Sequence, residues 1–235
     1  AQEATPMGRW AFHKAMKAGQ ARAEYVMVGK EPPAGVAAAY AFWDFLVLRN
    51  LRRMLGMDKM RRGGTGAAPI SPELLKWYWS IGVPLIEGYG MTENAGIATI
   101  NTLEHNAPGT VGHPVPGVEM RIAEDGEIQT MGLNNFQGYW RNNEKTAETY
   151  TSDGWLRTGD VGRVADAGYL IITGRIKDLI ICSGYNVYPR RIEEVLYEHP
   201  AVEEVTVIGI PDDYRGEAPK AFIKLVKGVR NCIND

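Results

Sequence analysis

The stretch GWLRTGDVGRVADAGYLIITGRIKDLIICSGYNVYP, residues 154–189, is the most informative part of this chain for its fold. Inside it, the runs VGRV and YLIIT have the pattern of two strands, and Ala165–Gly168 between them has the composition of a turn. We therefore predict a β-hairpin whose chain reversal brings Asp160 and Arg175 to the same edge of a sheet. An acidic acceptor beside a basic donor suits a sugar diol next to a phosphate, and an ordinary surface ion pair is the alternative.

Two blocks upstream carry further candidate ligand groups. In PLIEGYGMTENAG, residues 84–96, an apolar run ends in a glycine-flanked turn with Tyr89, Thr92 and Glu93. A tyrosine offers a flat face for a base, and hydroxyl and carboxylate oxygens suit Mg²⁺ and phosphate groups. The second block, GGTGAAP at 63–69, is a loop without side-chain bulk, and its glycines let the backbone approach a ligand closely. Each block alone is weak evidence, because glycine-rich loops are common.

In this order, the three blocks resemble the adenylate-forming superfamily of AMP-forming acyl-CoA synthetases, firefly luciferase and peptide-synthetase adenylation domains. YGMTE matches the family pattern Y-G-x-T-E, GWLRTGD matches W-x-x-T-G-D, and GRIKDLIICSGYNVYPRRIEE matches the longer pattern that follows. The resemblance runs from about Gly8 to Leu225. It implies an α/β fold: residues 1–176 would be the C-terminal portion of the large AMP-binding domain, with an α/β subdomain and a β-barrel-like subdomain. Residues 177–235 would be the hinge and a truncated small α+β C-terminal domain.

The resemblance also implies a role for each matching residue. The residues that would line the adenine are Gly66, Ala67, Ala68 and Tyr89, the last by packing on its ring. Thr92 would contact the α-phosphate of ATP, and Glu93 would hold Mg²⁺. Asp160 would bind both ribose hydroxyls with help from Arg175.

Two further positions concern the second half of the implied reaction. Lys177 matches the hinge about which the small domain of the family rotates between half-reactions. Gly184 would let the pantetheine arm of CoA approach the backbone. The implied reaction joins a carboxylic acid to CoA through an acyl-adenylate, with ATP and Mg²⁺.

Two motifs of the family are missing from this chain. These are the Ser/Thr/Gly-rich phosphate loop that ends in Pro-Lys-Gly, and the C-terminal catalytic lysine in P-K-T-x-x-G-K. We therefore expect an interior piece of a longer protein, and we expect the piece alone to be inactive.

The substrate is less narrowly defined. The segment from RNLRRMLG to EGYGMTENAG resembles long-chain fatty acyl-CoA synthetases, whereas the last part resembles medium- and long-chain enzymes of the bacterial type. The leading hypothesis is a long-chain fatty acid–CoA ligase. The alternatives are an adenylation enzyme for aryl or amino acids and a non-catalytic nucleotide-binding remnant.

Composition limits the partners. The formal net charge of −2 gives no general attraction to nucleic acid, and no apolar run is long enough for a transmembrane helix. Two cysteines, Cys182 and Cys232, do not make a disulfide framework, and the four histidines have no metal-ligand spacing. We expect a cytoplasmic protein that binds fatty acid, ATP and CoA, with peripheral membrane association through its lipid substrate. The oligomeric state stays open.

Periodicity predicts the main helices and strands. We expect helices at 8–28, 36–57, 72–80 and 190–199, and strands at 83–87, 178–182, 202–210 and 221–226. Ser71 precedes Pro72 at the start of the third helix, as a helix cap should. The basic run that includes Arg52 is expected to be a solvated face, and Trp77 and Trp79 are expected to pack in the core.

Overall fold

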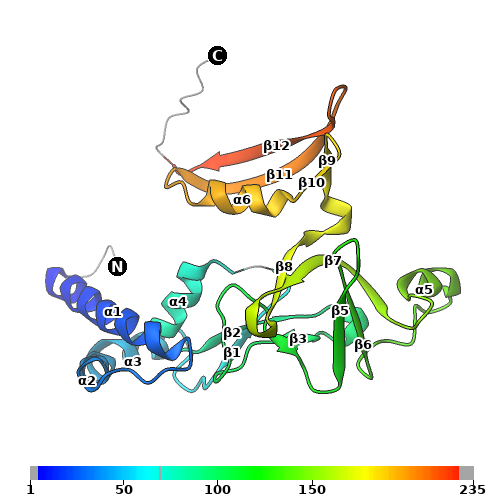
Figure 1. Ribbon diagram of the computed structural model, residues 1–235. Helices are drawn as coiled ribbons and strands as arrows, with labels where there is room; N and C mark the ends of the chain where they lie inside the picture. Colours follow the sequence, from blue (N-terminus) through cyan, green and yellow to red (C-terminus); the bar gives the residue numbers. More distant parts are fainter. Residues whose placement is uncertain (1–4, 69, 228–235) are drawn as a thin grey trace, which may run out of the picture. The chain divides into compact units, whose positions relative to one another are not determined.

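The computed structural model describes residues 5–68 and 70–227 (Figure 1). The chain divides into two compact units: residues 1–119, 131–146 and 164–171 form the first, and residues 120–130, 147–163 and 172–235 form the second. Both units mix helices and strands, as the sequence predicts. Among the described residues, no helix combines the length and the apolar character needed to cross a bilayer.

The helices of the first unit lie close to their predicted positions. They are α1 (Pro6–Val26), α2 (Ala34–Trp43), α3 (Arg49–Met54) and α4 (Pro72–Ser80), with a π-helical turn at Asp44–Leu48 that joins α2 to α3. The predicted cap of α4 is present, because the Ser71 hydroxyl accepts a hydrogen bond from the Leu74 N–H at 3.2 Å. α1 begins in the same way, with the Thr5 hydroxyl accepting from the Gly8 N–H.

Tryptophan packing follows the expectation, and so does most of the basic run, whose Arg49, Arg53, Lys59, Arg61 and Arg62 are exposed. Trp79 is 4% exposed, and its ring N–H donates to the Leu85 carbonyl oxygen at 2.7 Å, so this side chain belongs to the core. Arg52 was expected on a solvated face, and this is wrong. Its side chain is 15% exposed, and its guanidinium pairs with Asp44 and donates to the Ile81 carbonyl oxygen at 2.6 Å. The hydrogen bond that Arg52 donates to the Asp44 carboxylate raises the pKa of Arg52, so the charge persists despite burial.

The first sheet has the order β1-β2-β3-β4, with β1 (Gly63–Thr65), β2 (Leu85–Tyr89), β3 (Thr99–Ile100) and β4 (His113–Pro114). β1 and β2 are parallel, with α4 between them in the chain, and the remaining pairs are antiparallel. The loops that follow β1 and β2 therefore leave the sheet at the same edge. Ligands of α/β sheets bind at the carboxyl ends of parallel strands, so this arrangement makes that edge a candidate site.

The second sheet has the order β5-β6-β7-β8. Its strands are β5 (Val118–Ile122), β6 (Glu127–Gly132), β7 (Leu156–Val164) and β8 (Leu170–Arg175). The predicted hairpin is β7 and β8, joined by a 3₁₀ turn at Asp166–Gly168. A short helix α5 (Asn143–Thr149) was not predicted, because its polar sequence has no apolar stripe and none of its residues is buried.

The third sheet belongs to the second unit and has the order β10-β9-β12-β11. Its strands are β9 (Ile180–Cys182), β10 (Tyr185–Val187), β11 (Val202–Asp212) and β12 (Gly216–Leu225). Helix α6 (Pro189–Tyr197) lies along β11 (Figure 1). Ile192 and Leu196 of α6 pack against buried Ile180, Val205 and Val207. Val195, which was expected on the same apolar stripe, is instead 67% exposed. Cys182 is half-buried, and Cys232 lies outside the described residues.

Candidate nucleotide-binding site

The loop after β1 is narrow and carries no bulky side chain. The Ala68 N–H donates to the Gly66 carbonyl oxygen at 2.7 Å, which closes a tight turn around Ala67 with φ 63°. A Cβ at Gly66 would lie 3.0 Å from the Gly88 carbonyl oxygen, so this position tolerates little more than glycine. A left-handed alanine costs about 1–3 kcal/mol, and strain of this kind gathers at ligand sites. All three predicted adenine-lining residues of this loop are exposed.

Tyr89, the fourth predicted adenine contact, ends β2. Its backbone carbonyl accepts a hydrogen bond from the Ala98 N–H at 2.7 Å, and the residue is 8% exposed. Most of its surface is therefore packed against protein, and its stacking on a base stays a prediction.

Thr92 and Glu93 lie in a 3₁₀ turn, Thr92–Asn94, directly after β2. The turn is fixed from inside, because the buried Asn94 side chain accepts a hydrogen bond from the Met91 N–H at 2.8 Å. A Cβ at Gly90 would collide with the backbone of Gly96, so the loop folds back on itself with no room for a side chain. The structure thus brings Thr92 and Glu93 to the sheet edge where the loop after β1 also lies.

Tyr139 contacts Glu93, and the sequence alone did not predict this residue as part of the site. Its hydroxyl donates to Oε1 of Glu93 at 2.6 Å, the length of a charge-assisted hydrogen bond, and the Phe136 N–H donates to the Glu93 carbonyl at 2.7 Å. Phe136 and Tyr139 themselves pack edge to face with ring centroids 4.9 Å apart. The only sequence signal is this aromatic pair within a polar loop, and its distance along the chain from Glu93 concealed the contact.

The chemistry of Glu93 fits a hard cation. A carboxylate oxygen is a ligand that Mg²⁺ prefers, and Mg²⁺ usually binds through one or two carboxylates together with substrate phosphates and water. Within residues 5–68 and 70–227, no group of three or more histidine, cysteine or carboxylate side chains forms a closed metal site. Glu93 therefore fits a cation whose other ligands would come mainly from the phosphate oxygens of a bound nucleotide.

The hairpin of the second sheet confirms the predicted pairing of Asp160 with Arg175. Nε of Arg175 lies 3.3 Å from Oδ1 of Asp160, with the Asp160 side chain 15% exposed and the Arg175 side chain 56% exposed. The two groups form the ion pair that was the simpler interpretation, and their exposure leaves the guanidinium accessible to a ligand. Their roles toward ribose stay predictions.

Asp160 also lies at a β-bulge. Glu127 of β6 is opposite Val161, while Gln129 is opposite Arg157, so Thr158–Asp160 of β7 face Ile128 alone. Bulges occur next to active sites, where they turn a side chain away from the regular alternation of the strand. The bulge therefore interrupts the regular alternation of β7 at Asp160.

The two remaining predicted residues lie in turns of the second unit. Lys177 is exposed in the 3₁₀ turn Ile176–Asp178, between the end of β8 and the start of β9. Gly184 has φ 81°, and a Cβ there would meet no atom within 4 Å, so the backbone conformation and not crowding calls for glycine. Both positions are compatible with their predicted roles in domain rotation and CoA approach, which stay predictions.

Comparison with known proteins agrees with this arrangement. The family model for AMP-binding enzymes matches residues 13–140, and the model for the AMP-binding enzyme C-terminal domain matches residues 191–235. A long-chain-fatty-acid–CoA ligase of Mycobacterium bovis, FadD15, is 41% identical over 190 residues, which are 79% of this chain and 31% of that protein.

Solved structures are similar as well. ATP-bound MatB from Rhodopseudomonas palustris is 36% identical with a TM-score of 0.69, over 80% of this chain and 40% of that one. The anthranilate CoA ligase AuaEII, in complex with anthranoyl-AMP, is 33% identical with a TM-score of 0.66, over 74% of this chain and 36% of that one.

The fold and the motifs at the sheet edges define a class, the adenylate-forming enzymes. The chain belongs to the family of AMP-binding enzymes, which is part of the adenylate-forming acyl-CoA ligase superfamily. It spans about a third of the length of the curated relatives it matches.

Proposed function

We propose that the protein carrying this chain is an AMP-forming long-chain fatty acid–CoA ligase. It would convert a fatty acid, ATP and CoA into acyl-CoA, AMP and pyrophosphate. The observation that carries the adenylation chemistry is the Asp160–Arg175 pair on the hairpin, because it offers a carboxylate acceptor beside an exposed guanidinium. The choice of a fatty acid as the substrate rests on the 41% identity to a protein named as a long-chain-fatty-acid–CoA ligase.

The residues of this chain would bind and orient the nucleotide. The loop Gly66–Ala68 and Tyr89 would enclose the adenine, and Asp160 would accept hydrogen bonds from both ribose hydroxyls. Thr92 would contact the α-phosphate. Glu93, held by Tyr139, would be the protein ligand of Mg²⁺, which when bound neutralises phosphate charge.

The proposed reaction has two steps. An oxygen of the fatty acid carboxylate attacks the α-phosphorus of ATP, and the bond to pyrophosphate breaks. The CoA thiolate then attacks the carbonyl carbon of the acyl-adenylate, and AMP leaves with the bonding electrons. We propose a domain boundary between Ile176 and Lys177. Exposed Lys177 would be the hinge about which the small domain rotates between the two steps. Gly184 would border the CoA arm in the second.

An apolar cavity in the first unit supports an apolar acyl group. It has a volume of about 240 Å³ and is lined mainly by Met57, Met60, Ile70, Leu74 and Leu85, with Gly64 and Thr65 next to the predicted adenine loop. Such a lining suits an alkyl chain better than the charged group of an amino acid. An aryl acid is the second candidate, and the similarity to the anthranilate ligase favours it.

Thioester formation with matched acids tests the proposal. The protein carrying this chain is assayed with palmitate, octanoate, benzoate, anthranilate and leucine at equal concentration, with ATP, Mg²⁺ and CoA. We expect the highest kcat/KM with palmitate. A preference for benzoate or anthranilate would favour the aryl alternative, and the absence of ATP–pyrophosphate exchange with every acid would favour a non-catalytic nucleotide-binding protein. Co-sedimentation with vesicles containing palmitate would test association with a membrane.

A further inference from the structure

The bulge that carries Asp160 leaves backbone groups outside the ladder between β6 and β7. Three residues of β7, Thr158 to Asp160, face one residue of β6, so their N–H groups cannot all pair with that strand. A backbone N–H that is shielded from water without an acceptor costs free energy, so these groups need acceptors outside the ladder. Side chains must therefore hold the bulge in place.

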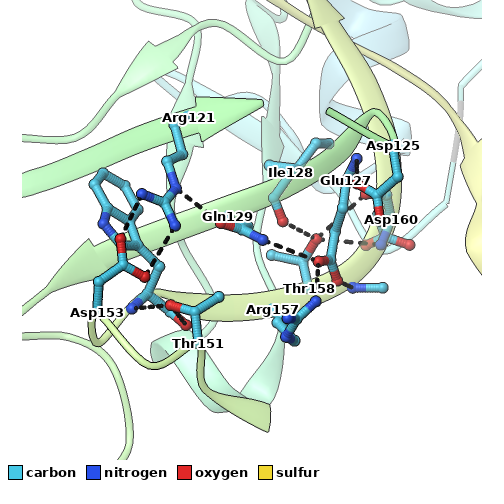
Figure 2. Close-up of polar contacts among 12 residues, drawn as sticks. Arg121, Asp125, Glu127, Ile128, Gln129, Thr151, Asp153, Arg157, Thr158 and Asp160 are labelled. Carbon is cyan, nitrogen blue, oxygen red and sulfur yellow. Dashed lines mark hydrogen bonds and ion pairs between the residues drawn. The ribbon is translucent and has the colours of Figure 1, made fainter. Parts of the chain in front are cut away.

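Glu127 supplies one of these contacts from the neighbouring strand (Figure 2). Oε1 of Glu127 accepts a hydrogen bond from the Gly159 N–H at 3.1 Å, directly before Asp160 in the chain. Oε2 accepts from the Gln129 side-chain amide at 3.1 Å and from the Arg157 guanidinium at 3.2 Å. A carboxylate that is 4% exposed is costly unless donors satisfy it, and these three donors do so.

The acceptor is itself held in position by a chain of hydrogen bonds. The side-chain Oε1 of Gln129 accepts from Nε of Arg121 at 2.8 Å, so the side-chain amide nitrogen is turned toward Glu127. Arg121 in turn pairs with Asp153 through two contacts of 2.7 and 3.1 Å. The orientation of the Glu127 carboxylate is therefore determined by side chains as well as by its own strand.

Thr158 supplies the second contact. Its hydroxyl donates to the Ile128 carbonyl oxygen at 2.6 Å and accepts from the Asp160 N–H at 3.1 Å. The N–H groups of Gly159 and Asp160 thus both donate to side chains, the first to Glu127 of β6 and the second to Thr158 of β7. Glu127 and Thr158 together fix the backbone from which the Asp160 carboxylate extends.

We propose that Glu127 is a positioning residue for nucleotide recognition, acting through Gly159 and the bulge to hold Asp160 toward the ribose hydroxyls. The inference rests on the proposed function, in which Asp160 accepts from the ribose. A merely structural carboxylate would stabilise the fold without influencing how the protein distinguishes nucleotides. Loss of a positioning carboxylate would weaken the binding of a nucleotide that has ribose hydroxyls and would leave the binding of one that lacks them unchanged.

The experiment measures the Kd of ATP and of 2′,3′-dideoxy-ATP for the protein carrying this chain. Variants are Glu127→Ala, Glu127→Gln and Thr158→Val, with Glu124→Ala as the control because Glu124 is an exposed carboxylate next to the same strand. Thermal unfolding of each variant checks that it is folded.

We expect Glu127→Ala to weaken ATP binding about tenfold and to leave dideoxy-ATP binding unchanged, since the dideoxy compound has no hydroxyls for Asp160 to bind. Glu127→Gln should keep part of the preference, because its amide oxygen can still accept from the Gly159 N–H, while its amide nitrogen cannot accept from Gln129 and Arg157. Glu124→Ala should behave like the wild type.

Other outcomes separate the two proposals. Equal weakening of both nucleotides by Glu127→Ala, or no change in either, would overturn the positioning role. If Glu127→Ala does not fold, Thr158→Val decides in its place, and an unchanged preference for ATP would overturn the role. A wild type that binds both nucleotides equally would overturn the ribose contact of Asp160, and the positioning role with it.

Discussion

The loops at the edge of the first sheet and the hairpin of the second sheet keep their shapes by different means. In the loops after β1 and β2, tight turns and absent side chains do the positioning, with the left-handed Ala67 and the crowded Gly90 as the main examples. At the hairpin, the buried Glu127 and the Thr158 hydroxyl hold a bulge through side-chain hydrogen bonds. The conformation of the loops therefore depends on the size of their residues, and the conformation of the hairpin depends on the register of its strands.

The largest effect is expected where the loop depends on having no side chain. Gly90→Ala would drive a Cβ into the backbone of Gly96, which cannot move as the end of a flexible side chain can. Overpacking of this kind costs about 1–3 kcal/mol or more, and we expect a lower midpoint in chemical unfolding. Gly64→Ala is the matched control, since a Cβ there meets nothing within 4 Å, and an equal loss in both variants would contradict the account.

The second prediction concerns the proposed metal ligand on the same loop. Glu93→Gln keeps the size of the side chain and removes the charge that Mg²⁺ prefers. We expect ATP–pyrophosphate exchange to fall most at limiting Mg²⁺ and to recover in part when Mg²⁺ is raised, while the unfolding midpoint stays near that of the wild type. Exchange that matches the wild type at every Mg²⁺ concentration would remove Glu93 from the metal site.

A smaller effect is expected from the tyrosine that holds this glutamate. Tyr139→Phe removes one hydrogen bond to the Glu93 carboxylate, an interaction worth about 1.5–3 kcal/mol when one partner is charged. We expect the Mg²⁺ concentration for half-maximal exchange to rise, with the loss smaller than in Glu93→Gln. Tyr150→Phe serves as the control, because this half-buried tyrosine lies away from the loop in the chain. An unchanged Mg²⁺ dependence in Tyr139→Phe would leave the contact without a role in metal binding.

The smallest effect lies at the far end of the hydrogen-bond chain in the second sheet. Hydrogen bonds from Arg121 lower the pKa of Asp153 from 3.8 to about 2. Because the folded-state pKa is depressed, the contribution to stability is present above about pH 4 and is lost as the pH falls through about 2. Asp153→Asn should therefore flatten the fall of the unfolding temperature in this range. An identical fall in the wild type and the variant would contradict the pairing.

The same comparison explains how much the sequence predicts. Motif residues at fixed spacing predict a nucleotide site, and the alternating runs on either side of Ala165–Gly168 predict the hairpin and the Asp160–Arg175 contact. Tyr139 and Glu127 could not be found in this way, because their partners lie 46 and 32 residues away in the chain. Arg52 was misplaced for the same reason, since the carbonyl that draws it inward belongs to Ile81.

Asp160 provides the most direct test of the central assignment, that this hairpin binds the ribose of an adenylate. ATP–pyrophosphate exchange with palmitate is measured for the wild type and for Asp160→Ala in the protein carrying this chain, with the KM for ATP as the readout. Loss of hydrogen bonds to a charged acceptor, about 1.5–3 kcal/mol, predicts a KM for ATP at least tenfold higher in a folded variant. An unchanged KM for ATP would mean that the Asp160–Arg175 pair is structural and would contradict the account.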